Sequence, residues 1–141
     1  MPGDIFKKLA FFEGLGDEQL NSLRPIFELC DCPPGMKIFA QGTPATYLYI
    51  VVAGEVLVEF KPYDAPLLNI ARVKPGGMFG WSAALGNRTY TSGAVSTTYT
   101  QVLRVQGDDL RNLCEKRQDI SDISFEDWRT LLPKGITFIR M

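Results

Sequence analysis

The chain has 141 residues, of which 45% are hydrophobic and 22% charged, and its formal net charge is −1. This size and composition are typical of one globular domain, expected to span residues 1–141, and the near-neutral charge gives no general attraction to nucleic acid or anionic membrane. The sequence lacks a run of ~20 apolar residues and a signal-peptide pattern, so we expect a cytoplasmic protein without membrane contact.

The chain contains no histidine and three cysteines, at Cys30, Cys32 and Cys114. Without histidine, Ser-His-Asp and Cys-His catalytic relays and histidine-ligated zinc or haem are excluded. Three thiols are too few for a four-thiolate metal site within one chain. Cys30 and Cys32 would share one face of a strand, a poor arrangement for a disulfide between them. We therefore expect free thiols, no metal site and no enzymatic activity.

Two short helices are expected at the start of the chain. Apolar residues recur at helical spacing over residues 4–13. Asp17 is a favourable N-cap for a second helix, and Pro25 limits or kinks that helix near its end. The apolar face of the second helix has residues three and four apart: Leu20, Leu23 and Phe27.

From residue 27 the pattern changes to short strands separated by glycine and proline turns. Residues 61–66 contain two prolines and an aspartate, which predicts an exposed hairpin tip. Strands every 8–12 residues predict a mainly β fold, a sandwich or rolled barrel over about residues 27–106 with helices at both ends. The expected strands are at residues 27–32, 36–39, 47–53, 55–60, 67–73 and 100–105.

Residues 76–95 have the composition of a ligand-binding segment. A Gly-rich turn, one helical turn of small residues, a polar loop and a return into a strand follow one another there. This order can place several backbone N–H groups around one anion or polar group, because the first N–H groups of a helix have no intrahelical partner.

A C-terminal helical segment is expected over about residues 107–133. Gly107 and Asp108 begin it, and Ser124 alternatively begins a separate short helix. Residues 134–141 have no clear assignment. The segment has no basic recognition helix, so no direct DNA binding is expected. Its apolar residues fall roughly on one helical face: Ile120, Ile123, Trp128 and Leu131.

Four motifs occur in a characteristic order: LAFFEGLGDEQL at residues 9–20, PGMKIFAQG at 34–42, LYIVVAGEVLV at 48–58 and KPGGMFG at 74–80. In this order the chain resembles the cyclic nucleotide-binding domain family, which includes the catabolite activator protein and protein kinase A regulatory subunits. The resemblance implies an eight-stranded jelly roll (a double-stranded β-helix) with N-terminal helices and a C-terminal helix. It also implies a phosphate-binding cassette and a homodimer formed through the C-terminal helix.

The resemblance implies a set of ligand contacts on the cassette, but two key positions differ. Members that bind cyclic nucleotides have Glu for the ribose hydroxyl where this chain has Trp81, and Arg for the phosphate where it has Thr91. A charge-assisted hydrogen bond contributes roughly 1.5–3 kcal/mol and about 1.4 kcal/mol is tenfold, so losing both predicts at least about two decades weaker binding. The expected ligand contacts are Phe79, Gly80, Trp81, Ser82, Ala83, Arg88, Thr91 and Ser92.

Two positions have open interpretations. Arg88 either compensates for the missing Arg or is a solvated loop residue. Trp81 either lines a pocket for an apolar or aromatic effector or fills the space where the ribose would sit.

We therefore expect a non-catalytic sensor of a cyclic nucleotide or another small effector, with weakened or altered cyclic nucleotide binding. One alternative is an ordinary cAMP or cGMP receptor that uses Arg88 and backbone amides. The other is a docking or dimerisation module with a filled pocket.

Overall fold

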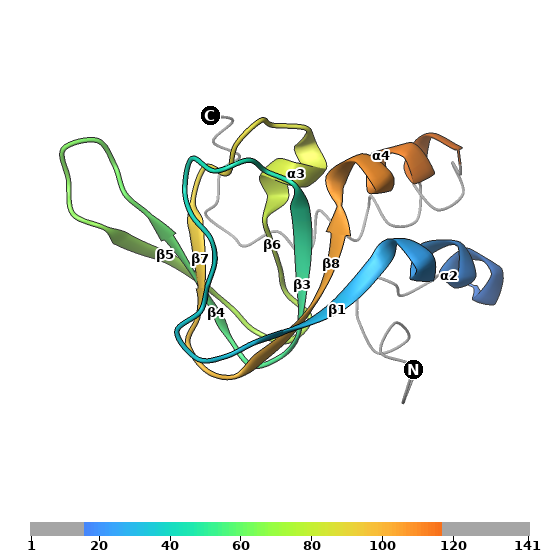
Figure 1. Ribbon diagram of the computed structural model, residues 1–141, viewed down its shortest axis with the longest axis horizontal. Coiled ribbons are helices and arrows are strands. Elements are labelled where there is room, and N and C mark those ends of the chain that lie inside the picture. The colour runs from blue at the N-terminus through green and yellow to red at the C-terminus, as the bar shows by residue number, and fades with distance from the viewer. Residues whose placement is uncertain (1–15, 117–141) are drawn as a thin grey trace.

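The computed structural model describes residues 16–116, apart from the Cys114 side chain. Within this range eight strands form two antiparallel four-stranded sheets (Figure 1). Sheet A has the strand order β1 (Phe27–Cys32), β8 (Thr100–Gln106), β3 (Tyr47–Ala53) and β6 (Met78–Phe79). Sheet B has the order β2 (Lys37–Phe39), β7 (Gly93–Ser96), β4 (Val56–Phe60) and β5 (Leu68–Val73). The expected mainly β, eight-stranded jelly roll is confirmed.

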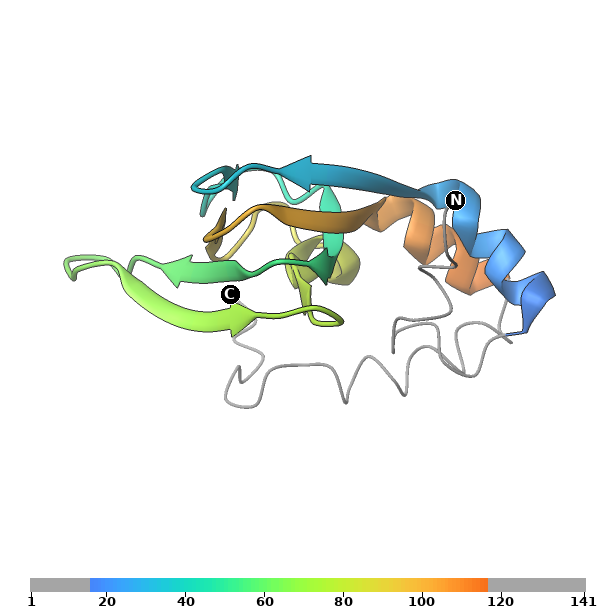
Figure 2. The ribbon, with the colours of Figure 1, turned by 90° about the horizontal axis from the view of Figure 1, so that it is seen from below.

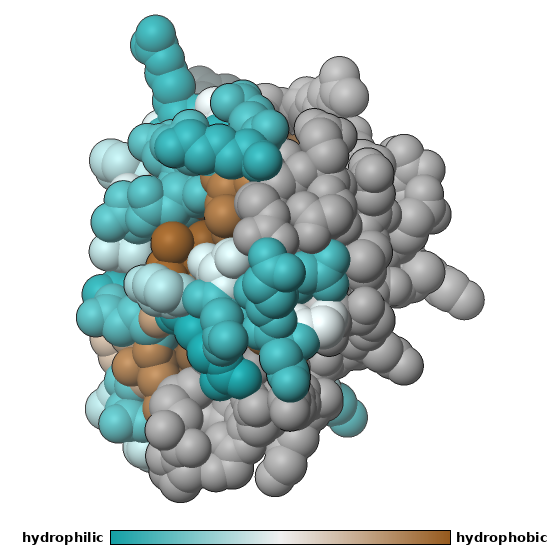
Figure 3. All heavy atoms as spheres, turned by 90° about the vertical axis from the view of Figure 1, so that its right-hand side faces the viewer, coloured by the Kyte–Doolittle hydropathy of each residue, from teal (hydrophilic) through white to brown (hydrophobic). Residues whose placement is uncertain are grey.

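The helices gather at one end of the roll. The helix α2 (Asp17–Leu23) and the short 3-10 turn η2 (Arg24–Ile26) precede β1, and α4 (Gly107–Lys116) follows β8. Figure 2 shows α2 and α4 side by side at this end. Hydrophilic side chains cover much of the described surface there, with hydrophobic ones in a strip between them (Figure 3). None of the helices within residues 16–116 has the length and apolarity to cross a bilayer.

The structure corrects the expected start of α2 and also the place of Phe27, which was expected on the helix face but is the first residue of β1. The N-cap is Gly16, one residue before the predicted Asp17, and the Gln19 side chain accepts the Gly16 N–H at 2.8 Å. Asp17 instead lies in the first turn, where its negative carboxylate interacts favourably with the positive end of the helix dipole. The helix ends at Leu23, before Pro25, which has no N–H to continue it. The expected helix at residues 4–13 and the segment beyond residue 116 lie outside the described range.

Each face of sheet A packs in a separate apolar cluster, because successive strand residues point to opposite faces. The outer cluster lies between sheet A and the helices. Its buried members are Leu20, Leu23, Leu48, Ile50, Met78, Leu103, Val105 and Leu110. The inner cluster lies between the two sheets. Its buried members are Cys32, Tyr49, Val51, Val56, Val58, Val73, Phe79, Ala94 and Val102.

Cys30 and Cys32 lie on the inner face of β1 and are both free, as expected for these two residues. Burial raises the pKa of each thiol above its usual value. The neutral thiol is therefore favoured at neutral pH, and both cysteines act as packing residues of the inner cluster.

Gly54 makes the tight connection from β3 to β4. Its φ is +91°, and a Cβ at this position would lie 2.5 Å from Thr100 Oγ1. Only glycine fits both the left-handed backbone and the close approach. The Thr100 hydroxyl also accepts the Glu55 N–H at 3.2 Å, so this turn is hydrogen-bonded to the first residue of β8.

Candidate functional site

The segment from β6 to β7 forms the cassette, with α3 (Trp81–Leu85) at its centre. Gly80 enters α3 with φ +83° and Gly86 leaves it with φ +80°. A Cβ on Gly80 would lie 2.8 Å from the Tyr47 carbonyl oxygen, so both backbone conformation and space require glycine there. Figure 1 shows α3 between the strands and α4. The expected order of glycine turn, helical turn, loop and strand is present.

The predicted ligand residues divide between the two faces of sheet A. Phe79 is buried between the sheets, where its ring stacks on Tyr49 with centroids 4.9 Å apart. Trp81 packs on the outer cluster, on the side of the sheet that the helices cover. Its two expected roles, lining an effector pocket and filling the ribose space, both stay predictions. Contact of Trp81 with a ligand stays a prediction.

The remaining predicted residues lie along the cassette backbone. Ser82 and Ala83 are buried within α3. Arg88 is exposed, and its carbonyl accepts the Ala45 N–H at 3.0 Å. Thr91 and Ser92 are half-buried at the point where the chain returns to β7. The structure therefore brings residues 79–83 and 91–92 to the same end of the roll and leaves Arg88 at the surface.

Five aromatic side chains pack in the interior of the roll beside the cassette, and only Phe79 among them was expected from the sequence to lie at the site. Tyr90 stacks on Phe39 with ring centroids 3.6 Å apart and an interplanar angle of 12°. Phe39 also stacks on Phe79 at 6.0 Å. The group, here called the aromatic cluster, consists of Phe39, Tyr47, Tyr49, Phe79 and Tyr90. The sequence held one signal for Tyr90, since it is a large aromatic residue next to Thr91 in an otherwise polar loop.

The Tyr90 hydroxyl is bonded to the backbone of the first residue of β3. It donates to the Tyr47 carbonyl at 2.6 Å and accepts the Tyr47 N–H at 2.9 Å. Burial raises the pKa of Tyr90 above its usual value, and burial also raises that of Tyr49. Both phenols therefore stay neutral well above neutral pH.

A cation on the inner face of sheet A lies against this cluster. The Arg104 guanidinium is 4.1 Å from the centre of the Tyr47 ring. Arg104 also pairs with Glu28 of β1 at 2.5 Å. Backbone pairing aligns Glu28, Arg104, Tyr49 and Phe79 in one row across the sheet, from the edge strand β1 to the cassette. Such cross-strand neighbours stabilise a sheet by direct side-chain contact.

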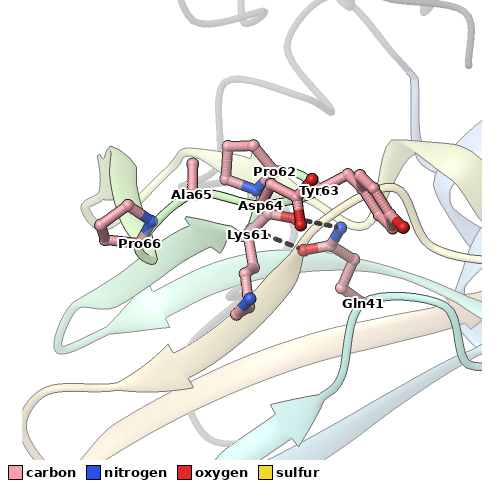
Figure 4. Close-up of a pocket in the computed structure, with 7 residues that line it drawn as sticks. All are labelled: Gln41, Lys61, Pro62, Tyr63, Asp64, Ala65 and Pro66. Carbon is pink, nitrogen blue, oxygen red and sulfur yellow. Dashed lines mark hydrogen bonds between the residues drawn. The ribbon is translucent and has the colours of Figure 1, made fainter.

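A separate open depression of about 720 Å³ lies at the tip of the β4–β5 hairpin (Figure 4). The Gln41 side-chain amide faces the hairpin, donating to the Lys61 carbonyl at 3.1 Å and accepting the Lys61 N–H at 2.8 Å. These two bonds fix the hairpin that residues 61–66 were expected to form. In residues 16–116, no group of three or more His, Cys, Asp or Glu side chains is arranged to hold a metal.

Comparison with known proteins places this geometry in a family. The family model of the cyclic nucleotide-binding domain matches residues 30–117. A CRP-like cAMP-activated global transcriptional regulator of Mycobacterium tuberculosis is 26% identical over 119 residues, which are 84% of this chain and 53% of that protein. This chain therefore spans about half the length of that curated relative.

Solved structures agree with this assignment. A cyclic nucleotide-binding-like protein from Brucella abortus is 29% identical with a TM-score of 0.63, over 79% of this chain and 95% of that chain. The catabolite activator protein of Thermus thermophilus is 25% identical with a TM-score of 0.73, over 87% of this chain and 56% of that chain. The family match covers the cassette and all eight strands except the first residues of β1, and this chain belongs to the cyclic nucleotide-binding domain family.

Proposed function

We propose that this domain is a non-catalytic regulatory sensor whose cassette binds cyclic nucleotides weakly or takes a different small effector. The observation that carries the proposal is Thr91, a half-buried neutral residue at the position where binding members of the family place a phosphate-contacting Arg. A hydroxyl donates one neutral hydrogen bond and brings no positive charge to a phosphate.

Other arginines of the described residues give limited help to an anion at the cassette. Arg104 is already paired with Glu28, and Arg111 is paired with Asp108. A carboxylate partner lowers the net positive charge that either guanidinium offers to a ligand. Arg88 is exposed, and its compensating contact with a phosphate stays a prediction.

The aromatic cluster favours a second candidate, a docking or dimerisation module whose interior is filled by its own side chains. Phe39, Tyr49, Phe79 and Tyr90 pack there within 6.0 Å of a neighbouring ring. In this case a surface, rather than an enclosed ligand, carries the function. The homodimer, the cytoplasmic location and the absence of DNA binding remain predictions, while the Mycobacterium tuberculosis relative is a transcriptional regulator.

Restoring the missing charge tests the sensor proposal. Calorimetric titration with cAMP compares the unmodified protein with Thr91→Arg, and we expect the variant to bind at least about tenfold tighter because it gains a charge-assisted hydrogen bond. Thr98→Arg is the matched control, since it makes the same change at an exposed threonine in the β7–β8 turn. Equal affinity of Thr91→Arg and the control would overturn the role given to position 91.

Native mass spectrometry with a thermal-shift screen separates the sensor from the docking module. A bound small molecule raises the free energy of unfolding by RT ln(1 + [L]/Kd), so a sensor gains thermal stability from its effector. A homodimer that no compound of the screen stabilises would favour the docking module.

A further inference from the structure

The Tyr90 ring lies inside the roll at the cassette, although it belongs to a loop of mostly polar residues. Only 4% of its surface is exposed. One face stacks on Phe39 at 3.6 Å, and its Cε1 is 3.5 Å from where a Cβ of Gly80 would lie. The ring therefore lies between β2 and the residue at which the chain enters α3.

Four hydrogen bonds hold Tyr90 in this place. The hydroxyl makes two with the Tyr47 backbone, at 2.6 and 2.9 Å. The Tyr90 N–H donates to the Thr43 carbonyl at 2.9 Å, and its carbonyl accepts the Gly42 N–H at 2.8 Å. The neighbouring residue Thr89 forms an isolated antiparallel bridge with Pro44. All polar groups of Tyr90 are satisfied by protein atoms, so its position needs no ligand.

This position coincides with the candidate site. Thr91 and Ser92 follow Tyr90 directly, and Gly80 lies against its ring. We propose that Tyr90 is a built-in plug of the cassette, which a nucleotide-sized ligand must displace before it binds. The proposal rests on the proposed function, because it takes the cassette as the ligand site.

A plug of this kind lowers the apparent affinity of the cassette for its ligand by a factor that can be calculated. When only a fraction of the molecules has the ring displaced, the apparent dissociation constant is the intrinsic one divided by that fraction. Removal of the ring makes every molecule competent, so affinity rises by the inverse of the fraction. Binding of a bulky ligand is thus weakened by two features, the Tyr90 ring and the missing positive charge at Thr91.

The test uses the full chain and cAMP as the probe, in the Thr91→Arg background. Calorimetry compares Thr91→Arg with the double variant Thr91→Arg/Tyr90→Ala, and we expect the double variant to bind cAMP at least about tenfold tighter. Tyr99→Ala in the same background is the control, because Tyr99 is half-exposed and bonded to Asp31 away from the cassette. Its affinity should equal that of Thr91→Arg.

Two further variants test the plug even if the Tyr90→Ala variant does not fold. Tyr90→Leu keeps an apolar side chain against Phe39 and should also tighten cAMP binding, by a smaller factor than Tyr90→Ala. Tyr90→Phe removes only the hydroxyl, so hydrogen exchange of the Tyr47 amide should become faster without any ligand present.

The outcomes keep the two proposals apart. The step from the unmodified protein to Thr91→Arg tests the proposed function, and the step from Thr91→Arg to the double variant tests the plug. A double variant or Tyr90→Leu variant that binds no tighter than Thr91→Arg, including no measurable binding by any of them, overturns the plug. Unchanged exchange of the Tyr47 amide in Tyr90→Phe also contradicts it.

Discussion

Gly107, the first residue of α4, lies directly against the carbonyl of Ala83 in the cassette helix α3. A Cβ on Gly107 would be 2.1 Å from the Ala83 oxygen. The Gly107 N–H also donates to the Thr46 carbonyl at 2.9 Å, next to the start of β3. The helix that follows the roll therefore begins in backbone contact with the cassette.

Substitution of Gly107 should separate these two helices. We expect Gly107→Ala to lower the free energy of unfolding by about 1–3 kcal/mol, because the added methyl cannot fit without a backbone shift. Urea unfolding followed by circular dichroism measures this. Asn112→Ala, an exposed position of the same helix, should stay within about 0.5 kcal/mol of the unmodified protein. Equal stabilities of the two variants would show that Gly107 is not in a tight contact.

Arg111 makes a second link between α4 and α3. Its guanidinium donates to the carbonyl of Ala83, which also accepts the Gly86 N–H at 3.3 Å, and, at 3.4 Å, to the carbonyl of Ala84. We expect Arg111→Ala to cost about 1–2 kcal/mol of unfolding free energy and Arg111→Lys to cost less.

Loss of the ion pair with Asp108 alone should not produce the destabilisation expected for Arg111→Ala. Asp108 is exposed, and exposed pairs contribute at most about 1 kcal/mol, so Asp108→Ala should be much milder than Arg111→Ala. An Asp108 variant as destabilised as the Arg111 variant would assign the effect to the ion pair instead of the α3 carbonyls.

The aromatic cluster predicts a loss of stability at alkaline pH. Burial raises the pKa of both Tyr49 and Tyr90 above the usual value of 10.0, so the folded state favours the neutral phenols more than the unfolded state does. Their contribution is fully present below about pH 10 and falls as the pH rises above it. Urea unfolding at pH 8, 9, 10 and 11 should show this decline. Tyr90→Phe should flatten it, whereas Tyr63→Phe at the exposed hairpin tip should leave it unchanged.

Most strands could be predicted because their signals are local. The strand at Tyr47–Ala53 has the predicted bounds, since a run of β-branched and aromatic residues ends at Gly54. The strand at Phe27–Cys32 also has the predicted bounds, and the other four expected strands differ by one residue because strand ends depend on their partners. Glu55, expected within a strand, lies in the turn before β4, where its N–H bonds to Thr100.

The inside of the site was less predictable because it depends on contacts distant in sequence. Tyr90 meets Tyr47 across 43 residues, and Arg111 meets Ala83 across 28. Trp81 turns to the helical face rather than to the roll interior, a choice that position within a motif does not fix. The cassette's backbone order follows from its glycines, but the packing of its large side chains follows from the tertiary fold.

We infer that the cassette lacks the side-chain charge needed for tight binding of a cyclic nucleotide. Calorimetric titration of the unmodified protein with cAMP, and separately with cGMP, tests this most directly. We expect no binding in the micromolar range for either nucleotide, because Thr91 and Trp81 stand at the two positions that should supply the ionic contacts. A dissociation constant in the micromolar range or below for either nucleotide would contradict it.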